Sequence, residues 1–117
     1  MISTASVAAE DGQIGQVSLH GSKGGVQSIT LPVARDLAQS GIRVMTFLPS
    51  LLMTPIFDAL PEDARRALAA SVPFPSRFGK PTEYAALAIH IRENIMLNGR
   101  IHPFGRRRPP AATLSFK

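Results

Sequence analysis

The sequence predicts an α/β fold built around a small parallel sheet, and three features of the chain point to it. Residues 42–48 (IRVMTFL) form an apolar run between Gly41 and Pro49, which is typical of a strand buried on both faces. Before this run, over Gly15–Ser40, apolar residues recur at spacings of three and four, as in a helix. A strand, a helical crossover and a second strand in this order give parallel strands.

The elements before the central strand follow from the same patterns. Residues 1–9 are small and apolar, which suits a strand end that runs into a loop. The helix expected over Gly15–Ser40 contains several glycines and Pro32. Each glycine destabilises a helix interior by about 1 kcal/mol, and a proline does so by about 3 kcal/mol. Gly41 suits the cap that ends this helix.

Two more helices and a short edge strand are expected after the central strand. They are marked by acidic residues in a first helical turn, by a threonine suited to capping, and by a proline that restricts a strand to an edge. The expected segments are a loop at Pro49–Pro55, a helix at 60–70, a proline-rich connector at 72–81, a helix at 83–94 capped by Thr82, and a strand at 101–104. Two or three parallel strands leave much of a sheet uncovered, so we expect the chain to be part of a larger fold.

Length and composition exclude several classes of function. A chain of 117 residues allows one small domain. The absence of cysteine excludes disulfides, thiolate catalysis and cysteine-bound zinc, and the three histidines share no ligand spacing, so no metal site is expected. No apolar run approaches the roughly 20 residues of a membrane span. The N-terminal residues lack a basic stretch, so we expect no signal peptide and a cytoplasmic location.

The net charge of +5 is carried by one end of the chain. Residues 1–99 hold eight basic and eight acidic side chains and are neutral as a whole. The excess lies in Arg100, Arg106, Arg107, Arg108 and Lys117. A basic end is compatible with RNA or an anionic membrane, but only Phe104 and Phe116 accompany it as platforms for bases, so a nucleic-acid-binding protein is the less favoured function.

Three stretches of the chain resemble the C-terminal half of the short-chain dehydrogenase/reductase family, and within it the type-2 3-hydroxyacyl-CoA dehydrogenase branch. They are STASVAAEDGQIGQVSLHGSK at 3–23, GGVQSITLPVARDLAQSGIRVMTFLPSLLMTP at 24–55 and VPFPSRFGKPTEYAALAIHIRENIMLNG at 72–99. The resemblance implies the C-terminal half of a Rossmann-like, doubly wound parallel sheet over residues 1–99, incomplete because the N-terminal dinucleotide-binding half has no counterpart. It also implies NAD as cofactor and a 3-hydroxyacyl-CoA or similar secondary alcohol as substrate.

By this resemblance, Ser6 is the catalytic serine that orients the substrate oxygen, and Lys23 is the lysine that holds the nicotinamide ribose. The family's general base is a tyrosine four residues before that lysine, and the lysine lowers the pKa of the tyrosine. Leu19 stands at this position and has no proton to exchange, so the central acid/base is missing. His20 is an alternative base, but one step along a helix turns a side chain by about 100°, so we expect a partly exposed helical histidine instead.

The loop after the central strand is, by the same resemblance, the one that closes over the nicotinamide. Pro49 and Thr54 match its cofactor-binding residues, and Thr54 is the one that meets the carboxamide. Ser50 replaces the family's glycine and is expected to crowd the cofactor. The glycine-rich turn that cradles the pyrophosphate is absent from the sequence.

The resemblance stops after Gly99, and residues 100–117 are rich in Arg, Pro and Ala. We expect this tail to be disordered and hypothesise that it is translated from a shifted reading frame. The chain is thus predicted to be a truncated short-chain dehydrogenase that is inactive by itself. The alternative is a non-catalytic remnant that pairs with full-length dehydrogenase subunits, or with itself, through the Gly15–Ser40 helix.

Overall fold

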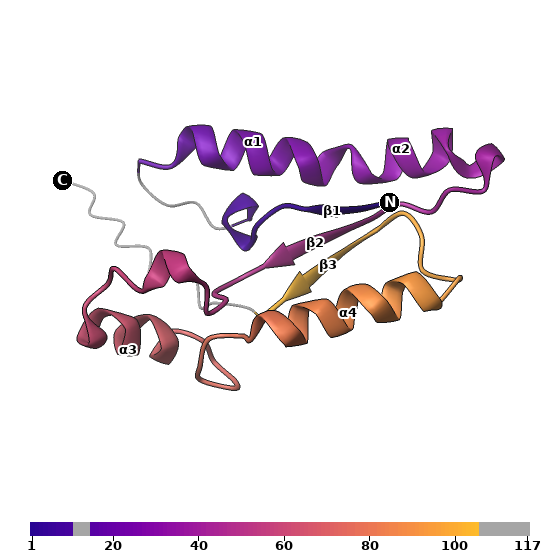
Figure 1. Ribbon diagram of the computed structural model, residues 1–117. Coiled ribbons are helices and arrows are strands. Elements are labelled where there is room, and N and C mark those ends of the chain that lie inside the picture. Colours follow the sequence, from indigo (N-terminus) through magenta and orange to yellow (C-terminus); the bar gives the residue numbers. More distant parts are fainter. Residues whose placement is uncertain (11–14, 106–117) are drawn as a thin grey trace.

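The computed structural model describes residues 1–10 and 15–105 of the chain. Three strands, β1 (Ile2–Thr4), β2 (Met45–Pro49) and β3 (Arg100–Phe104), pair in parallel in the order β1-β2-β3. Helices α1 (Val17–Ser28) and α2 (Thr30–Asp36) lie on one face of the sheet, and α4 (Pro81–Glu93) lies on the other (Figure 1). The helix α3 (Glu62–Ala70) lies near the end where the strands finish (Figure 1). The predicted α/β fold with a parallel sheet is confirmed.

The central strand β2 is buried because helices cover both of its faces. Met45 and Phe47 pack against Ile91 of α4, whereas Leu48 lies in the cluster that Val26 of α1 packs against. Successive side chains of a strand point to opposite faces, so a strand covered on both sides is apolar except where a buried polar group, here the hydroxyl of Thr46, has a hydrogen-bond partner. The largely apolar run at 42–48 predicted this strand, which begins three residues later, at Met45.

The long helix expected over Gly15–Ser40 is divided into α1, α2 and a short 3-10 turn, Ala38–Ser40. The break falls at Ile29, and Pro32 explains it. Proline has no N–H, so the carbonyl of Ser28, four residues earlier, loses its helical partner. The chain ends this segment at Gly41, whose φ of 68° confirms the predicted glycine cap.

The start of α4 differs from the sequence-based expectation. The helix begins at Pro81 and is preceded by Lys80, so Thr82 lies inside the first turn and does not cap it. Proline's fixed φ suits the first helical position, where its missing N–H is not needed. The cap is supplied by Glu83, whose carboxylate accepts a hydrogen bond of 2.7 Å from the backbone N–H of Lys80. The acidic first turn expected for α3 is confirmed.

The strand β3 confirms the edge strand expected at 101–104 and corrects the prediction that the tail is disordered from residue 100 onwards. Its five residues, Arg100–Phe104, pair with β2 and belong to the sheet, so the ordered fold extends beyond Gly99. Residues 106–117, which carry the rest of the predicted tail, lie outside the described residues. The boundary at 99 and the shifted reading frame stay predictions.

Candidate functional site

The parallel sheet brings two of the predicted site segments to the end of the sheet where its strands finish. β1, β2 and β3 end at the same side of the sheet (Figure 1). Ser6 follows β1 by two residues, Pro49 is the last residue of β2, and Gly105 follows β3. In open α/β sheets ligands bind beside the carboxyl ends of the strands. A ligand-binding site is therefore expected at this carboxyl end of the sheet.

Ser6 is held in place by the short 3-10 turn that follows it. It precedes Val7–Ala9, and its Oγ accepts a hydrogen bond of 3.1 Å from the backbone N–H of Ala8. The hydroxyl is half-buried and keeps its own proton for a second hydrogen bond. The role of Ser6 in orienting a substrate oxygen stays a prediction.

Helix α1 packs against this turn and carries the other predicted catalytic positions. Leu19 and Lys23 are separated by one helical turn and share a face of α1. Leu19 is 40% exposed and Lys23 is half-buried. The structure thus presents an aliphatic side chain where the resemblance calls for the general base.

His20 lies on α1 beside Leu19 and is half-buried, as expected for a helical histidine. Its Nδ1 lies 2.7 Å from the backbone carbonyl oxygen of Gln16, one turn earlier on the same helix. This contact holds the ring along its own helix.

Pro49 and Thr54 lie at the end of β2 and in the loop that follows it, at the same carboxyl end of the sheet. Both residues are half-buried. Thr54 precedes the 3-10 turn Pro55–Phe57, and its backbone carbonyl accepts a hydrogen bond of 3.0 Å from the N–H of Phe57. Its side chain makes no capping bond and remains available to a ligand.

Ser50 is turned towards the end of β3. Its backbone N–H donates to the carbonyl of Phe104 at 2.9 Å, and a Cβ placed on Gly105 would lie 3.7 Å from the Cβ of Ser50. The Oγ of Ser50 is buried and has no hydrogen-bond partner among the described residues. A glycine at this position would lack the Cβ and Oγ; that the serine crowds a cofactor stays a prediction.

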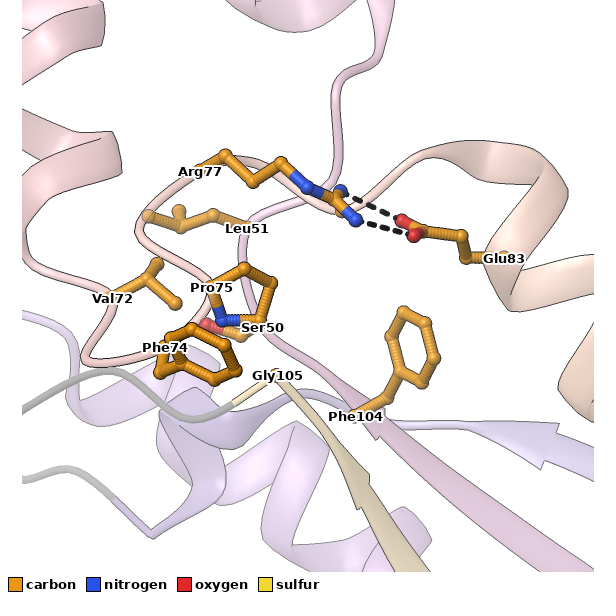
Figure 2. A pocket seen from close by; sticks show the side chains of 10 residues that line it. Ser50, Leu51, Val72, Phe74, Pro75, Arg77, Glu83, Phe104 and Gly105 are labelled. Atoms are coloured by element: carbon orange, nitrogen blue, oxygen red, sulfur yellow. Dashed lines mark hydrogen bonds and ion pairs between the residues drawn. The ribbon is translucent and has the colours of Figure 1, made fainter.

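A cavity of about 300 Å³ opens beside Ser50, and the sequence analysis did not predict it. Apolar side chains make most of its wall, with the Arg77–Glu83 pair at one side (Figure 2). It is lined by Ser50, Leu51, Val72, Phe74, Pro75, Arg77, Gly79, Glu83, Phe104 and Gly105. None of Ser6, Lys23, Pro49 or Thr54 belongs to this wall. The only signal for it in the sequence was the segment VPFPSRFG, which supplies five of these residues.

Arg77 and Glu83 form a two-pronged ion pair at the rim of this cavity (Figure 2). The two guanidinium nitrogens of Arg77 lie 2.9 and 2.5 Å from the two carboxylate oxygens of Glu83. The hydrogen bond from Arg77, helped by that from the Lys80 N–H, lowers the pKa of Glu83 from 4.5 to about 2. The same pair raises the pKa of Arg77.

This lowered pKa predicts an acid-sensitive contribution to stability. The ionised carboxylate stabilises the fold above about pH 4.5, and this contribution is lost as the pH falls towards the folded pKa of about 2. We expect the urea midpoint of the native chain to fall more between about pH 5 and about pH 2.5 than that of Glu83→Gln. Both side chains are partly exposed, so the difference should be small. Glu62→Gln, which removes only the exposed pair with Arg66, is the control; equal slopes for Glu83→Gln and the native chain would contradict the assignment.

The residues present fit only part of a dinucleotide. Ser6, Lys23, Pro49 and Thr54 belong to the nicotinamide end of the site that the resemblance implies. The pyrophosphate needs a glycine-rich turn at the start of a helix, and the sequence contains none. The residues of this chain by themselves do not fit NAD as a whole.

The described residues also lack a metal-binding cluster and a membrane-spanning helix. Residues 1–10 and 15–105 contain no group of three or more histidine, aspartate or glutamate side chains that could hold a metal ion. Across the same ranges, no helix has the length and apolarity needed to cross a membrane.

Comparisons with known proteins relate this chain to a family of reductases and dehydrogenases. A family model described as enoyl-(acyl carrier protein) reductase matches residues 1–94. The 3-hydroxyacyl-CoA dehydrogenase type-2 proteins of Mus musculus and Homo sapiens are each 55% identical over 101 residues, which is 86% of this chain. A 3-oxoacyl-[acyl-carrier-protein] reductase of Thermotoga maritima is 35% identical over 91 residues.

A solved structure supports the same relationship. The crystal structure of 3-hydroxyacyl-CoA dehydrogenase type-2 from Mycobacterium avium is 40% identical and superposes with a TM-score of 0.87, covering 92% of this chain and 43% of its own. The chain spans only 39% of the length of the mouse and human relatives. It therefore belongs to the short-chain dehydrogenase/reductase family and holds the C-terminal half of that family's fold.

Proposed function

We propose that this chain is an oxidoreductase by descent that has no catalytic activity of its own. Its lineage is that of 3-hydroxyacyl-CoA dehydrogenase type-2, with NAD and a 3-hydroxyacyl-CoA or similar secondary alcohol as the ancestral reactants. The observation that carries the proposal is Leu19, which stands on α1 one turn before Lys23 where the family has its general base.

The chemistry explains why one side chain matters so much. Oxidation of a secondary alcohol requires that the hydroxyl proton pass to a base while hydride leaves the carbon. Ser6 can orient the alcohol oxygen and Lys23 can supply a positive charge, but Leu19 accepts no proton. His20 is one residue further, about 100° around the helix, and is engaged with the carbonyl of Gln16.

A second candidate function is pairing with full-length dehydrogenase subunits, or with another copy of this chain. It is favoured by apolar side chains that α1, α2 and the residue between them expose to solvent: Val17, Leu19, Ile29 and Leu31. Side chains of this kind on neighbouring helices form surfaces that are usually covered by another protein. In this role the chain contributes a helical face and no chemistry.

The test is an assay of the purified chain with a 3-hydroxyacyl-CoA and NAD, following NADH absorbance, with the mouse enzyme as positive control. We expect no turnover by the native chain, and none by Leu19→Tyr, because the pyrophosphate half of the cofactor site is still lacking. Turnover by the native chain would show the proposal to be wrong. Turnover by Leu19→Tyr, or binding of NADH by the native chain, would show that the missing part of the cofactor site is not essential. Loss of any such activity in His20→Ala would identify His20 as the base.

Pairing of this chain with full-length subunits is tested by a separate experiment. The tagged chain is co-expressed with the untagged mouse enzyme, and co-purification is measured. We expect Ile29→Asp, between α1 and α2, to abolish co-purification, and Ile89→Asp, a comparably exposed position on α4, to leave it unchanged. Equal effects of the two variants would exclude the α1–α2 face as the pairing surface.

A further inference from the structure

The connection between α4 and β3 contains an asparagine followed by a glycine, Asn98–Gly99, and the asparagine is exposed. In such a pair the backbone nitrogen of the glycine can attack the side-chain amide carbon of the asparagine, because glycine has no side chain that hinders the approach. The chain has one other asparagine, Asn94, and it is followed by the bulky Ile95. Asn98 is therefore the asparagine of this chain that is more prone to deamidation.

The fold holds both reacting groups of this pair on a single buried residue, Val44. The N–H of Gly99 donates to the carbonyl of Val44 at 2.8 Å, and the N–H of Val44 donates to Oδ1 of Asn98 at 2.8 Å. For the attack, the Gly99 nitrogen has to lose its proton and the side-chain amide of Asn98 has to turn towards it. Both bonds to Val44 must open first, so the folded state restrains the reaction.

Arg43, the residue before Val44, ties down the same connection. Its guanidinium donates to the carbonyls of Asn94 and Leu97 at 3.1 and 3.0 Å. The connection returns from the end of α4 to the point where β2 and β3 begin (Figure 1). Opening at Val44 therefore requires that this part of the chain move away from the start of β2.

The products of the reaction differ in the length of the main chain. The Gly99 nitrogen gives its proton to base in the solvent and bonds to Cγ of Asn98, while the bond from Cγ to Nδ2 breaks and Nδ2 leaves as ammonia. Water then opens the cyclic imide at one of its two carbonyls and gives aspartate or isoaspartate at position 98. In isoaspartate the main chain runs through Cβ and Cγ, so it is longer by one carbon and Oδ1 has become a main-chain oxygen.

This change falls directly ahead of β3, which begins one residue after Gly99. The carbonyl of Phe104 accepts from the N–H of Ser50, so Phe104 and, by alternation, His102 direct their backbone groups towards β2. A longer main chain before Arg100 displaces this register and moves Oδ1 away from the Val44 N–H. A buried donor without its acceptor is unfavourable. Isoaspartate therefore loosens β3, whereas aspartate keeps the backbone length and an oxygen at the same place.

We propose that Asn98 is a modification site at which deamidation is restrained by the bonds to Val44 and, when it yields isoaspartate, detaches β3 from the sheet. The reaction consumes water, releases ammonia and requires no enzyme. The proposal is therefore independent of the dehydrogenase lineage and of any catalytic activity of the chain.

The first experiment compares the rate of deamidation in the folded and the unfolded chain. The native chain is kept at mildly alkaline pH with and without urea, and conversion of each asparagine is followed by peptide mass spectrometry. We expect Asn98 to convert at least about tenfold more slowly without urea, and Arg43→Met to convert at least about threefold faster than the native chain. Arg35→Met should match the native chain, and Asn94 is the internal control. Equal rates with and without urea, an unchanged rate in Arg43→Met, or conversion of Asn94 as fast as that of Asn98 would overturn the proposal.

The second experiment measures what the modification does to β3. The isoaspartate form is separated by ion exchange and compared with Asn98→Asp, which has the same charge and an unaltered main chain. We expect the His102 amide to exchange at least about tenfold faster in the isoaspartate form, and within about twofold of the native rate in Asn98→Asp. The Ala5 amide, which donates to Phe47 at 2.8 Å between β1 and β2, should keep its native rate in both. Native exchange at His102 in the isoaspartate form, or an equal acceleration at Ala5, would show that β3 is not selectively detached and would contradict the proposal.

Discussion

Replacement of Phe47 by alanine is expected to abolish the folded state of this chain. Phe47 has no exposed surface and is the largest fully buried side chain of the described residues. Its ring meets that of Tyr84 edge-to-face, with centroids 5.1 Å apart, and packs against Ile91. It therefore joins the central strand to α4, which is the principal cover on that face of the sheet.

The size of the effect follows from the cavity that the change leaves. Truncation of a buried phenylalanine to alanine costs about 3–5 kcal/mol. Whole domains are stable by only about 5–15 kcal/mol, and small ones lie at the lower end. Phe47→Ala is thus expected to remove most or all of the free energy of unfolding.

The measurement uses the single tyrosine of the chain, because no tryptophan is present. Near-ultraviolet circular dichroism of Tyr84 in increasing urea reports whether the Phe47–Tyr84 contact exists. Phe74→Ala removes the same ring at a position that is 91% exposed and should leave the midpoint nearly unchanged. A Phe47→Ala midpoint within error of the Phe74→Ala midpoint would contradict the assigned role.

The second large effect is expected for Arg43→Met. One guanidinium nitrogen of Arg43 donates to the carbonyls of Ile91, Asn94 and Leu97 at 2.8 to 3.1 Å, and the other donates to the carbonyl of Arg92 at 2.7 Å. These carbonyls lie in the last turn of α4 and just beyond it, where helical partners are missing. A positive charge here also interacts favourably with the helix dipole.

Methionine keeps the length of the side chain and removes these bonds. Hydrogen bonds from a charged donor contribute about 1.5–3 kcal/mol each, and water replaces some of them at this half-buried position, so we expect a loss of about 2–3 kcal/mol in the free energy of unfolding. Arg35→Met, on the exposed surface of α2, controls for loss of charge. Equal losses for the two variants in urea titrations would show that Arg43 does not anchor α4.

The parts of the fold that the sequence predicted correctly depend on local patterns. The run IRVMTFL indicated a strand covered on both faces, and alternation at β2 bears this out, with Phe47 under α4 and Leu48 under α1. Gly41 and the acidic start of α3 are likewise local signals. Where two local signals conflicted the prediction failed: Pro32 divided the long helix at Ile29, and Pro81 moved the start of α4 ahead of Thr82.

The resemblance supplied the residues of the candidate site, whereas their surroundings became visible only in the structure. The resemblance assigned Ser6, Leu19 and Lys23. The structure puts Leu19 and Lys23 on one face of α1, and this helix packs against the turn that Ser6 caps. The cavity beside Ser50 was missed because its walls come from four separate segments of the chain. The ion pair of Arg77 and Glu83 was missed for the same reason.

The sequence by itself determined the α/β class, the buried central strand, the neutral body with a basic end, and the loss of the tyrosine at position 19. The first three depend on residue type and on spacing along the chain, and the last depends on the resemblance to the short-chain dehydrogenase/reductase family. Only the tertiary structure decided that Arg43 bonds to the carbonyls at the end of α4, and that Arg77 and Glu83 form an ion pair beside a cavity. These depend on which backbone groups and side chains distant segments bring together, and spacing along the chain does not encode such distances.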